Sequence, residues 1–191
     1  MYGKNVIIIA CITPLGVYGT DEKGKPAIPW KSKIDMTHFK KETEHNTVIM
    51  GRKTYLSLPN RTLPNREIIV VTSKTEDLRS KGVIACSSLI EAIEKAKNQK
   101  VFVIGGGGLW TLALSYANEI HTTIIDAPVS ETNRTVSCKV LIDPTRRYPN
   151  FKLISERVEF EELEIGNRFT LKFCVYKRMT SKKTKWKSEK D

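Results

Sequence analysis

This 191-residue sequence lacks the usual marks of a membrane protein, a metal protein or a disulfide-stabilised protein. Its four cysteines are widely spaced and form no Cys-x-x-Cys pair, so we expect reduced thiols in a cytoplasmic protein and no metal site. No apolar run approaches the ~20 residues that a membrane-spanning helix needs. The first residues lead into a short apolar segment without a small-residue cleavage site, so we also expect no signal peptide. There is no internal repeat.

Acidic side chains are scarce beside basic ones, 21 against 32, and the formal net charge is +11. Residues 177–191 carry seven of the basic side chains and only two of the acidic ones. The basic charge elsewhere suits a pocket for phosphorylated or carboxylated small molecules as well as it suits nucleic acid. We expect one domain over residues 1–178 and a solvated basic tail over residues 179–191.

Apolar runs rich in β-branched residues alternate along the chain with amphipathic segments. We expect strands at residues 6–12, 47–51, 67–72, 100–104 and 119–125, with helices at 32–43, 88–97 and 109–116. Two further runs, 151–160 and 168–176, indicate an antiparallel pair joined by a turn. Residues 13–29 are expected to form a loop, and residues 130–150 have no clear period. The alternation predicts an α/β sheet with an antiparallel C-terminal edge.

The segment from Pro29 to Lys40 contains a carboxylate in an unusual setting. Ser32 and Asp35 have the spacing of a capping box, so a helix is expected to begin there. Asp35, Met36 and Phe39 are spaced to share one side of that helix. Asp35 is therefore either a capping residue at the border of the core or a buried carboxylate that orients and helps to protonate a ligand.

Three strand ends carry groups suited to phosphate. Residues 51–54 supply two cations and a hydroxyl, residues 72–74 supply two hydroxyls and a cation, and residues 105–108 are four glycines that open a helix. Ligands of open α/β sheets bind at such ends. The glycine run is not G-x-G-x-x-G, because Trp110 stands where the third glycine would be. Arg52 and Lys53 suit a 2′-phosphate and so favour NADPH over NADH.

Several motifs together resemble dihydrofolate reductase. They are Ala10, Pro29-Trp30, Asp35-Met36-x-x-Phe39-Lys40, Val48-Ile49-Met50-Gly51-Arg52-Lys53-Thr54, Leu63-Pro64-Asn65-Arg66, Val103-Ile104-Gly105-Gly106-Gly107, Thr123 and Ile125-Asp126-Ala127. The resemblance covers residues 5–127 and, more weakly, the last two strands. It implies a mostly parallel eight-stranded sheet with flanking helices, a monomer, and NADPH as cofactor. It also implies hydride transfer to C6 of 7,8-dihydrofolate with protonation of N5.

The resemblance further implies roles for individual residues. The catalytic group would be Asp35, Trp30 and Thr123. The substrate would lie against Ile8, Ile9, Asp35, Met36, Phe39, Leu58, Leu63, Arg66, Ile104 and Thr123. The cofactor would contact Ala10, Tyr18, Gly19, Gly51, Arg52, Lys53, Thr54, Val71, Thr72, Ser73, Lys74, Gly105, Gly106, Gly107, Gly108 and Leu109. A cis peptide bond would fall at Gly105–Gly106, and the loop before Trp30 would act as a lid.

Two other interpretations stay open at this point. A pyrimidine reductase of riboflavin synthesis would share the fold and the NADPH site, but it needs no slot for p-aminobenzoyl-glutamate such as Phe39, Leu58, Leu63 and Arg66 would form. Alternatively, a reductase body could act as a scaffold whose basic tail binds nucleic acid or a protein, with Trp186 stacking on a base. The loop at 19–29 is longer than in short bacterial members of the family, and the Gly-Asp-Thr turn that many members carry after Asp126-Ala127 is absent.

Overall fold

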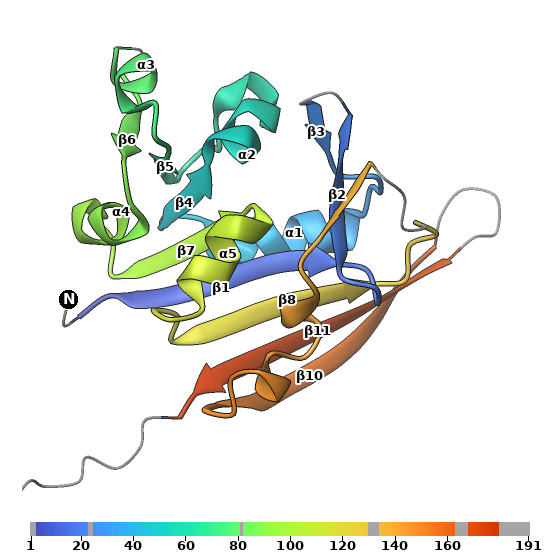
Figure 1. Cartoon of the computed structure of the whole chain (residues 1–191). Coiled ribbons are helices and arrows are strands. Elements are labelled where there is room, and N and C mark those ends of the chain that lie inside the picture. The colour runs from blue at the N-terminus through green and yellow to red at the C-terminus, as the bar shows by residue number, and fades with distance from the viewer. Residues whose placement is uncertain (1–2, 23–24, 81, 130–133, 163–167, 180–191) are drawn as a thin grey trace, which may run out of the picture.

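The computed structural model describes residues 3–22, 25–80, 82–129, 134–162 and 168–179. These residues form an eight-stranded sheet in the order β10-β11-β8-β1-β7-β4-β5-β6 (Figure 1). The strands are β1 Asn5–Ile12, β4 Thr47–Gly51, β5 Glu67–Val71, β6 Ile84–Cys86, β7 Lys100–Gly105, β8 Glu119–Ile125, β10 Phe151–Glu162 and β11 Arg168–Arg178. Six neighbouring strands from β8 to β6 are parallel, and β11 pairs antiparallel with both β8 and β10. The predicted fold class is confirmed.

In the described part of the chain, five short helices lie on the two faces of this sheet (Figure 1). They are α1 Lys33–Thr43, α2 Arg52–Ser57, α3 Thr75–Arg79, α4 Leu89–Lys95 and α5 Gly107–Ala113, with 3₁₀ turns at Pro59–Arg61, Lys139–Leu141 and Pro144–Arg146. Successive residues of β1 point alternately to the two faces of the sheet. Ile8 and Ala10 pack in the cluster with α4 and α5, whereas Ile7 and Ile9 pack in the cluster with Phe39 of α1 and Tyr55 of α2.

The expected loop at residues 13–29 contains secondary structure that the sequence pattern does not reveal. Strands β2 Val17–Glu22 and β3 Lys25–Ala27 form a hairpin, and β2 also pairs with β9 Thr135–Ser137. The order of this second sheet is β3-β2-β9. The strands are short and partly charged, and β9 lies more than a hundred residues away, so no local hydrophobic period could indicate them.

The C-terminal elements follow the predicted pattern. β10 and β11 pair over their whole length, from Phe151 opposite Arg178 to Glu162 opposite Arg168. The expected turn around Gly166-Asn167 and residues 180–191 of the expected basic tail lie outside the described residues. No helix of the described part is long and apolar enough to cross a membrane.

Candidate active site

Asp35 lies in the first turn of α1 and presents its carboxyl to the sheet. Ser32 is the N-cap of the helix, and its Oγ accepts a hydrogen bond from the backbone N–H of Asp35 over 3.0 Å. The carboxyl of Asp35 accepts hydrogen bonds from the side chains of Thr123 and Cys11. These two residues are direct neighbours across the pair β8–β1, so their side chains lie on one face of the sheet. The helix cap is thus made by Ser32, and the carboxyl of Asp35 is held by the strands.

The surroundings of Asp35 change its acidity. Burial raises the pKa of its carboxyl, although the hydrogen bonds from Thr123 and Cys11 act to lower it, and the charge of Glu161 adds to the rise. Burial and the charge of Asp35 also raise the pKa of the Cys11 thiol well above its ordinary value. Cys11 therefore stays protonated and can act as a donor. A carboxyl with a raised pKa holds its proton closer to neutral pH, as a proton-delivering group must.

Trp30 closes the site next to Cys11. The indole N–H donates a hydrogen bond to the Cys11 sulfur, and the ring is 8% exposed. It packs with Ala127 and with Phe169 and Leu171 of β11. This apolar corner keeps water from one side of the Asp35 carboxyl.

The predicted substrate wall is only partly assembled from the expected residues. Its apolar members on the α1 face share one cluster: Ile9, Phe39, Leu58, Leu63 and Ile104. Ile8 does not belong there. Its side chain is fully buried on the opposite face of β1, because successive strand residues point to opposite sides. Met36 is 60% exposed, so it does not shield Asp35 as the helical spacing suggested.

Arg66 is held in place at the far end of this wall. Its Nε donates to Thr43 Oγ1 over 3.2 Å, its Nη1 to the Pro64 carbonyl over 2.6 Å, and its Nη2 to the Lys40 carbonyl over 3.3 Å. These acceptors lie on α1 and on the segment after α2. A guanidinium fixed in this way can present its outer N–H groups to a carboxylate without losing much rotamer entropy.

The three phosphate-suited turns lie side by side. β7, β4 and β5 are parallel neighbours, so the turns after Gly105, Gly51 and Val71 leave the same edge of the sheet. An added Cβ at Gly105 would come within 3.5 Å of Thr54 Oγ1, and one at Gly51 within 3.7 Å of the Gly105 carbonyl oxygen. The predicted cis peptide bond at Gly105–Gly106 is present.

This edge has donors that fit an anionic dinucleotide. Arg52 Nε is buried and has no hydrogen-bond partner among the described residues. This donor at the start of α2 is therefore available to an acceptor on a ligand. Lys53 Nζ, the other predicted 2′-phosphate ligand, is 2.7 Å from Asp21 Oδ2 of β2, and this ion pair raises the pKa of Lys53. Thr72 Oγ1 accepts from the Lys74 N–H over 3.1 Å, which shapes the third turn, where Ser73 lies between them.

The hairpin β2–β3 reaches the glycine turn through Tyr18. The Tyr18 hydroxyl accepts a hydrogen bond from the Gly107 N–H over 3.0 Å, and its ring meets Trp110 edge-on with centroids 4.9 Å apart. Gly19 has no room for a side chain, because an added Cβ would lie 2.9 Å from the Ala27 carbonyl oxygen. Tyr18 thus joins the hairpin to the glycine turn, and Gly19 lets the two strands of the hairpin pack closely. The remaining predicted contacts, Ala10 and Leu109, are buried in the core below the turn.

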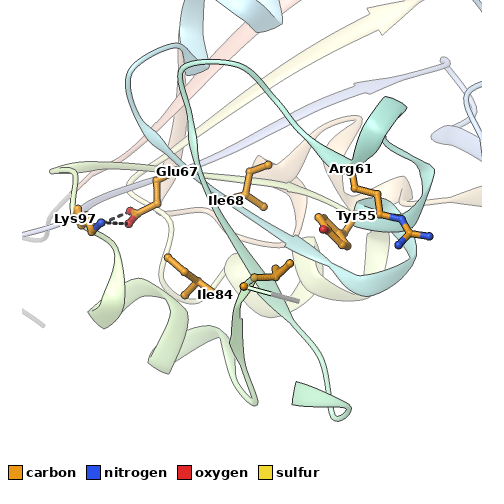
Figure 2. A pocket seen from close by; sticks show the side chains of 8 residues that line it. Tyr55, Arg61, Glu67, Ile68, Ile84 and Lys97 are labelled. Carbon is orange, nitrogen blue, oxygen red and sulfur yellow. Dashed lines mark hydrogen bonds and ion pairs between the residues drawn. The ribbon is translucent and has the colours of Figure 1, made fainter. Parts of the chain in front are cut away.

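A groove on the α2 side of the sheet contains none of the predicted site residues. Figure 2 shows it between Tyr55 and Arg61 at one end and the Glu67–Lys97 ion pair, 3.8 Å between Oε1 and Nζ, at the other. Ile68 and Ile84 form its apolar floor. Its lining comes from α2 and the segment after it, from β5 and β6, and from the segments just before β6 and just after α4.

Two functional candidates lie outside the sequence predictions. Cys11 lies in the predicted strand at residues 6–12 without a predicted role, and Glu161 lies just beyond the predicted strand at residues 151–160. Cys11 could have been found from its position opposite Thr123 once the strand register was known. Glu161 reaches Ser32 across 129 positions of sequence, and no local signal indicates such a contact.

A family model described as dihydrofolate reductase matches residues 5–178. The chain belongs to the dihydrofolate reductase family. A dihydrofolate reductase of Buchnera aphidicola subsp. Baizongia pistaciae is 30% identical over 178 residues, covering 92% of this chain and 99% of the relative. That of Bacillus subtilis is 32% identical over 162 residues, covering 82% and 86%. In fold, the chain is similar to an Enterococcus faecalis dihydrofolate reductase complexed with NADP(H), with a TM-score of 0.71 at 22% identity over 91% of this chain and 96% of that one.

Membership of the dihydrofolate reductase family makes the chain an NADP-dependent oxidoreductase that acts on dihydrofolate. The edge formed by the three turns has the donors that such a cofactor needs. The apolar wall has a carboxyl at one end, that of Asp35, and a fixed cation at the other, Arg66. This is the arrangement that a dihydrofolate reductase needs.

Proposed function

We propose that this chain reduces 7,8-dihydrofolate to 5,6,7,8-tetrahydrofolate at the site around Asp35, with Asp35, Thr123 and Trp30 as its catalytic group. The observation that carries the proposal is the environment of the Asp35 carboxyl. This carboxyl is partly buried, hydrogen-bonded by Thr123 and Cys11, and raised in pKa by burial. It is the acidic group that faces the apolar wall from the first turn of α1.

Asp35 has two tasks in this proposal. Its carboxyl orients the pterin by hydrogen bonding to N3 and the 2-amino group, with Thr123 fixing the carboxyl. Its raised pKa favours the protonated carboxyl, from which a proton can reach N5 directly or through water, a contribution of ~10²–10⁴ in rate. When bound, NADPH supplies the hydride that C6 accepts.

The other end of the wall selects the substrate. Phe39, Leu58 and Leu63 would pack on the p-aminobenzoyl ring, and Arg66 would pair with the glutamate carboxylate. This slot argues against the interpretation of the chain as a pyrimidine reductase of riboflavin synthesis, because that enzyme needs no such slot. Holding the two rings face to face accounts for most of the remaining rate acceleration.

The proposal also assigns roles to the predicted cofactor residues. Arg52 and Lys53 would bind the 2′-phosphate, and Asp21 must release Lys53 for that contact to form. Gly51, Thr54, Val71, Thr72, Ser73 and Lys74 would line the adenosine side, and Gly105 to Gly108 the pyrophosphate. Ala10, Tyr18 and Gly19 would lie on the nicotinamide side, and Leu109 would lie in the core below the glycine turn. A monomeric state, a cytoplasmic location and a role in one-carbon metabolism remain predictions from the sequence.

The test is NADPH oxidation with dihydrofolate, measured at 340 nm for the parent and for Asp35→Asn across pH 5–9. We expect clear turnover by the parent and a loss of roughly 10²–10⁴ in the variant near neutral pH. The loss should shrink in acid, where the substrate can arrive already protonated. Asp126→Asn, which changes an exposed aspartate after β8, is the matched control and should keep the parent profile.

Two outcomes would contradict the proposal. A parent that binds NADPH but does not oxidise it with dihydrofolate would refute the substrate. An Asp35→Asn variant with the parent's rate near neutral pH would refute the role of Asp35. The alternative in which the basic tail binds nucleic acid or protein concerns residues outside the described part, and a salt-sensitive binding assay with and without residues 179–191 tests it separately.

A further inference from the structure

The N-terminus of α1 is held by a carboxylate from the other end of the chain. Glu161 of β10 accepts a hydrogen bond from Ser32 Oγ through Oε2. It also accepts from the backbone N–H of Lys33 through Oε1 over 2.6 Å and from that of Ile34 through Oε2 over 3.3 Å. The next N–H, of Asp35, donates to Ser32 Oγ over 3.0 Å. The first three helical N–H groups, which a helix cannot satisfy internally, are thereby all bonded.

Because Glu161 and Ser32 bond the first helical N–H groups, the side chain of Asp35 is not needed as a helix cap. A carboxylate at the third helical position usually turns back to the cap, as the Ser32–Asp35 spacing suggested. Here the negative charge at the helix N-terminus is supplied by Glu161, where the helix dipole favours it. Burial acts to raise the pKa of Glu161, but the hydrogen bonds from Ser32, Lys33 and Ile34 outweigh it and hold this pKa below its usual value. Glu161 therefore stays charged beside Asp35.

We propose that Glu161 is a positioning residue for the reaction at Asp35, a role that rests on the proposed function. Its carboxylate fixes the start of α1, and with it the place and the charge environment of the Asp35 carboxyl. The link runs from Glu161 through Ser32 to the Asp35 backbone, and it requires no contact between Glu161 and the substrate.

The charges around Glu161 make a specific test possible. The groups that face it are Ser32, Lys33 and Asp35 of α1, the apolar Phe169 opposite it on β11, and Arg157 and Glu159 on the same face of β10. The charge of Glu161 acts to raise the pKa of Asp35. Removing that charge must lower the Asp35 pKa, so the decline of kcat with rising pH should begin at lower pH.

The experiment compares Glu161→Gln with the parent and with Glu159→Gln, which removes the same charge two residues away on the same strand face. For Glu161→Gln we expect a kcat about three- to tenfold lower on the alkaline side and a KM for dihydrofolate within about twofold. The alkaline limb should move to lower pH. ¹³C NMR titration of Asp35 in the free protein should give a lower pKa than in the parent. Glu159→Gln should match the parent in both measurements.

Glu161→Asp separates the effect of the negative charge from the effect of side-chain length. It keeps the negative charge on a shorter side chain, so it should restore the alkaline limb toward the parent while kcat stays below it. If Glu161→Gln does not fold, Glu161→Asp carries the test through the same two readouts. A variant that loses thermal stability but keeps the parent's Asp35 pKa and kcat profile would reduce Glu161 to a structural cap. Because the NMR titration needs no turnover, an inactive parent would refute the proposed function without touching the link between Glu161 and Asp35.

Discussion

Cys11 touches the Asp35 carboxyl from β1 and opposes the effect of Glu161. Its hydrogen bond acts to lower the Asp35 pKa, and its own pKa is raised well above the ordinary value by burial and by Asp35. Cys11→Ala removes the donor, so the Asp35 pKa should rise and the alkaline limb of kcat should move to higher pH. That direction is opposite to the one expected for Glu161→Gln. The measurement is the same pair of kcat profile and NMR titration.

Cys86→Ala serves as the control for Cys11→Ala, because Cys86 is fully buried in the α4 cluster on the other face of the sheet. Its removal should leave both readouts as in the parent. A Cys11→Ala profile that does not move, or that moves to lower pH, would show that the thiol does not act as a donor to Asp35.

At the scale of elements, the glycine turn is packed against Tyr18 on only one side. An added Cβ at Gly107 would lie 2.9 Å from Tyr18 Oη, whereas one at Gly108 would meet nothing within 4 Å. Gly107→Ala should therefore displace Tyr18 and cost about 1–3 kcal/mol of the free energy of unfolding. Gly108→Ala should be neutral or stabilising by up to about 1 kcal/mol, because alanine restricts the unfolded chain and favours the helix.

Thermal unfolding without ligand measures both glycine variants, and a difference of 1 kcal/mol corresponds to about 2–4 °C at this chain length. Equal melting temperatures for Gly107→Ala and Gly108→Ala would contradict the close approach of Tyr18 to the turn.

The elements that the sequence predicted are those whose signal is local. The buried strands around β1 are continuous apolar runs, and the helix after Ser32 has a cap and a period, so both could be read directly. The hairpin β2–β3 could not, because its strands pair with each other and with β9 across long sequence separation. Asp35 was indicated by its spacing from Ser32, and Thr123 by the family resemblance. The sides on which Ile8 and Met36 lie could not be predicted in this way, because they depend on the strand register and on burial.

At the scale of the whole molecule, α1 is held to the sheet at both ends. Glu161 of β10 binds its N-terminus, and Glu42 near its C-terminus lies 3.4 Å from Nδ1 of His121 on β8. The Nε2 of His121 is also 3.0 Å from Glu119. β8 carries both His121 and Thr123, so the ion pair and the Asp35–Thr123 hydrogen bond join the same two elements. Stability and the geometry of the site are therefore linked through one helix–strand contact.

The His121 contact predicts a specific pH dependence of stability. Burial acts to lower the pKa of His121, but the carboxylates of Glu42 and Glu119 outweigh it and raise this pKa above 6.5, while His121 lowers the Glu42 pKa below 4.5. A histidine with a raised pKa stabilises the fold fully below its unfolded pKa, and the gain is lost as pH rises through its folded pKa. The Glu42 contribution is present above pH 4.5 and is lost as pH falls through its folded pKa. The pair is therefore most effective between about pH 4.5 and 6.5.

Urea unfolding of the parent and of His121→Gln at a series of pH values tests this dependence. The free energy by which the parent exceeds the variant should be about 1–2 kcal/mol near pH 6 and should shrink as pH rises into the alkaline range. His45→Asn is the matched control, because His45 is exposed and has a φ of 60° that asparagine tolerates, so it should keep the parent's pH dependence. A parent–variant difference that stays constant from pH 6 to pH 9 would mean that His121 is not charged in the folded protein, and α1 would then be held to β8 by packing alone.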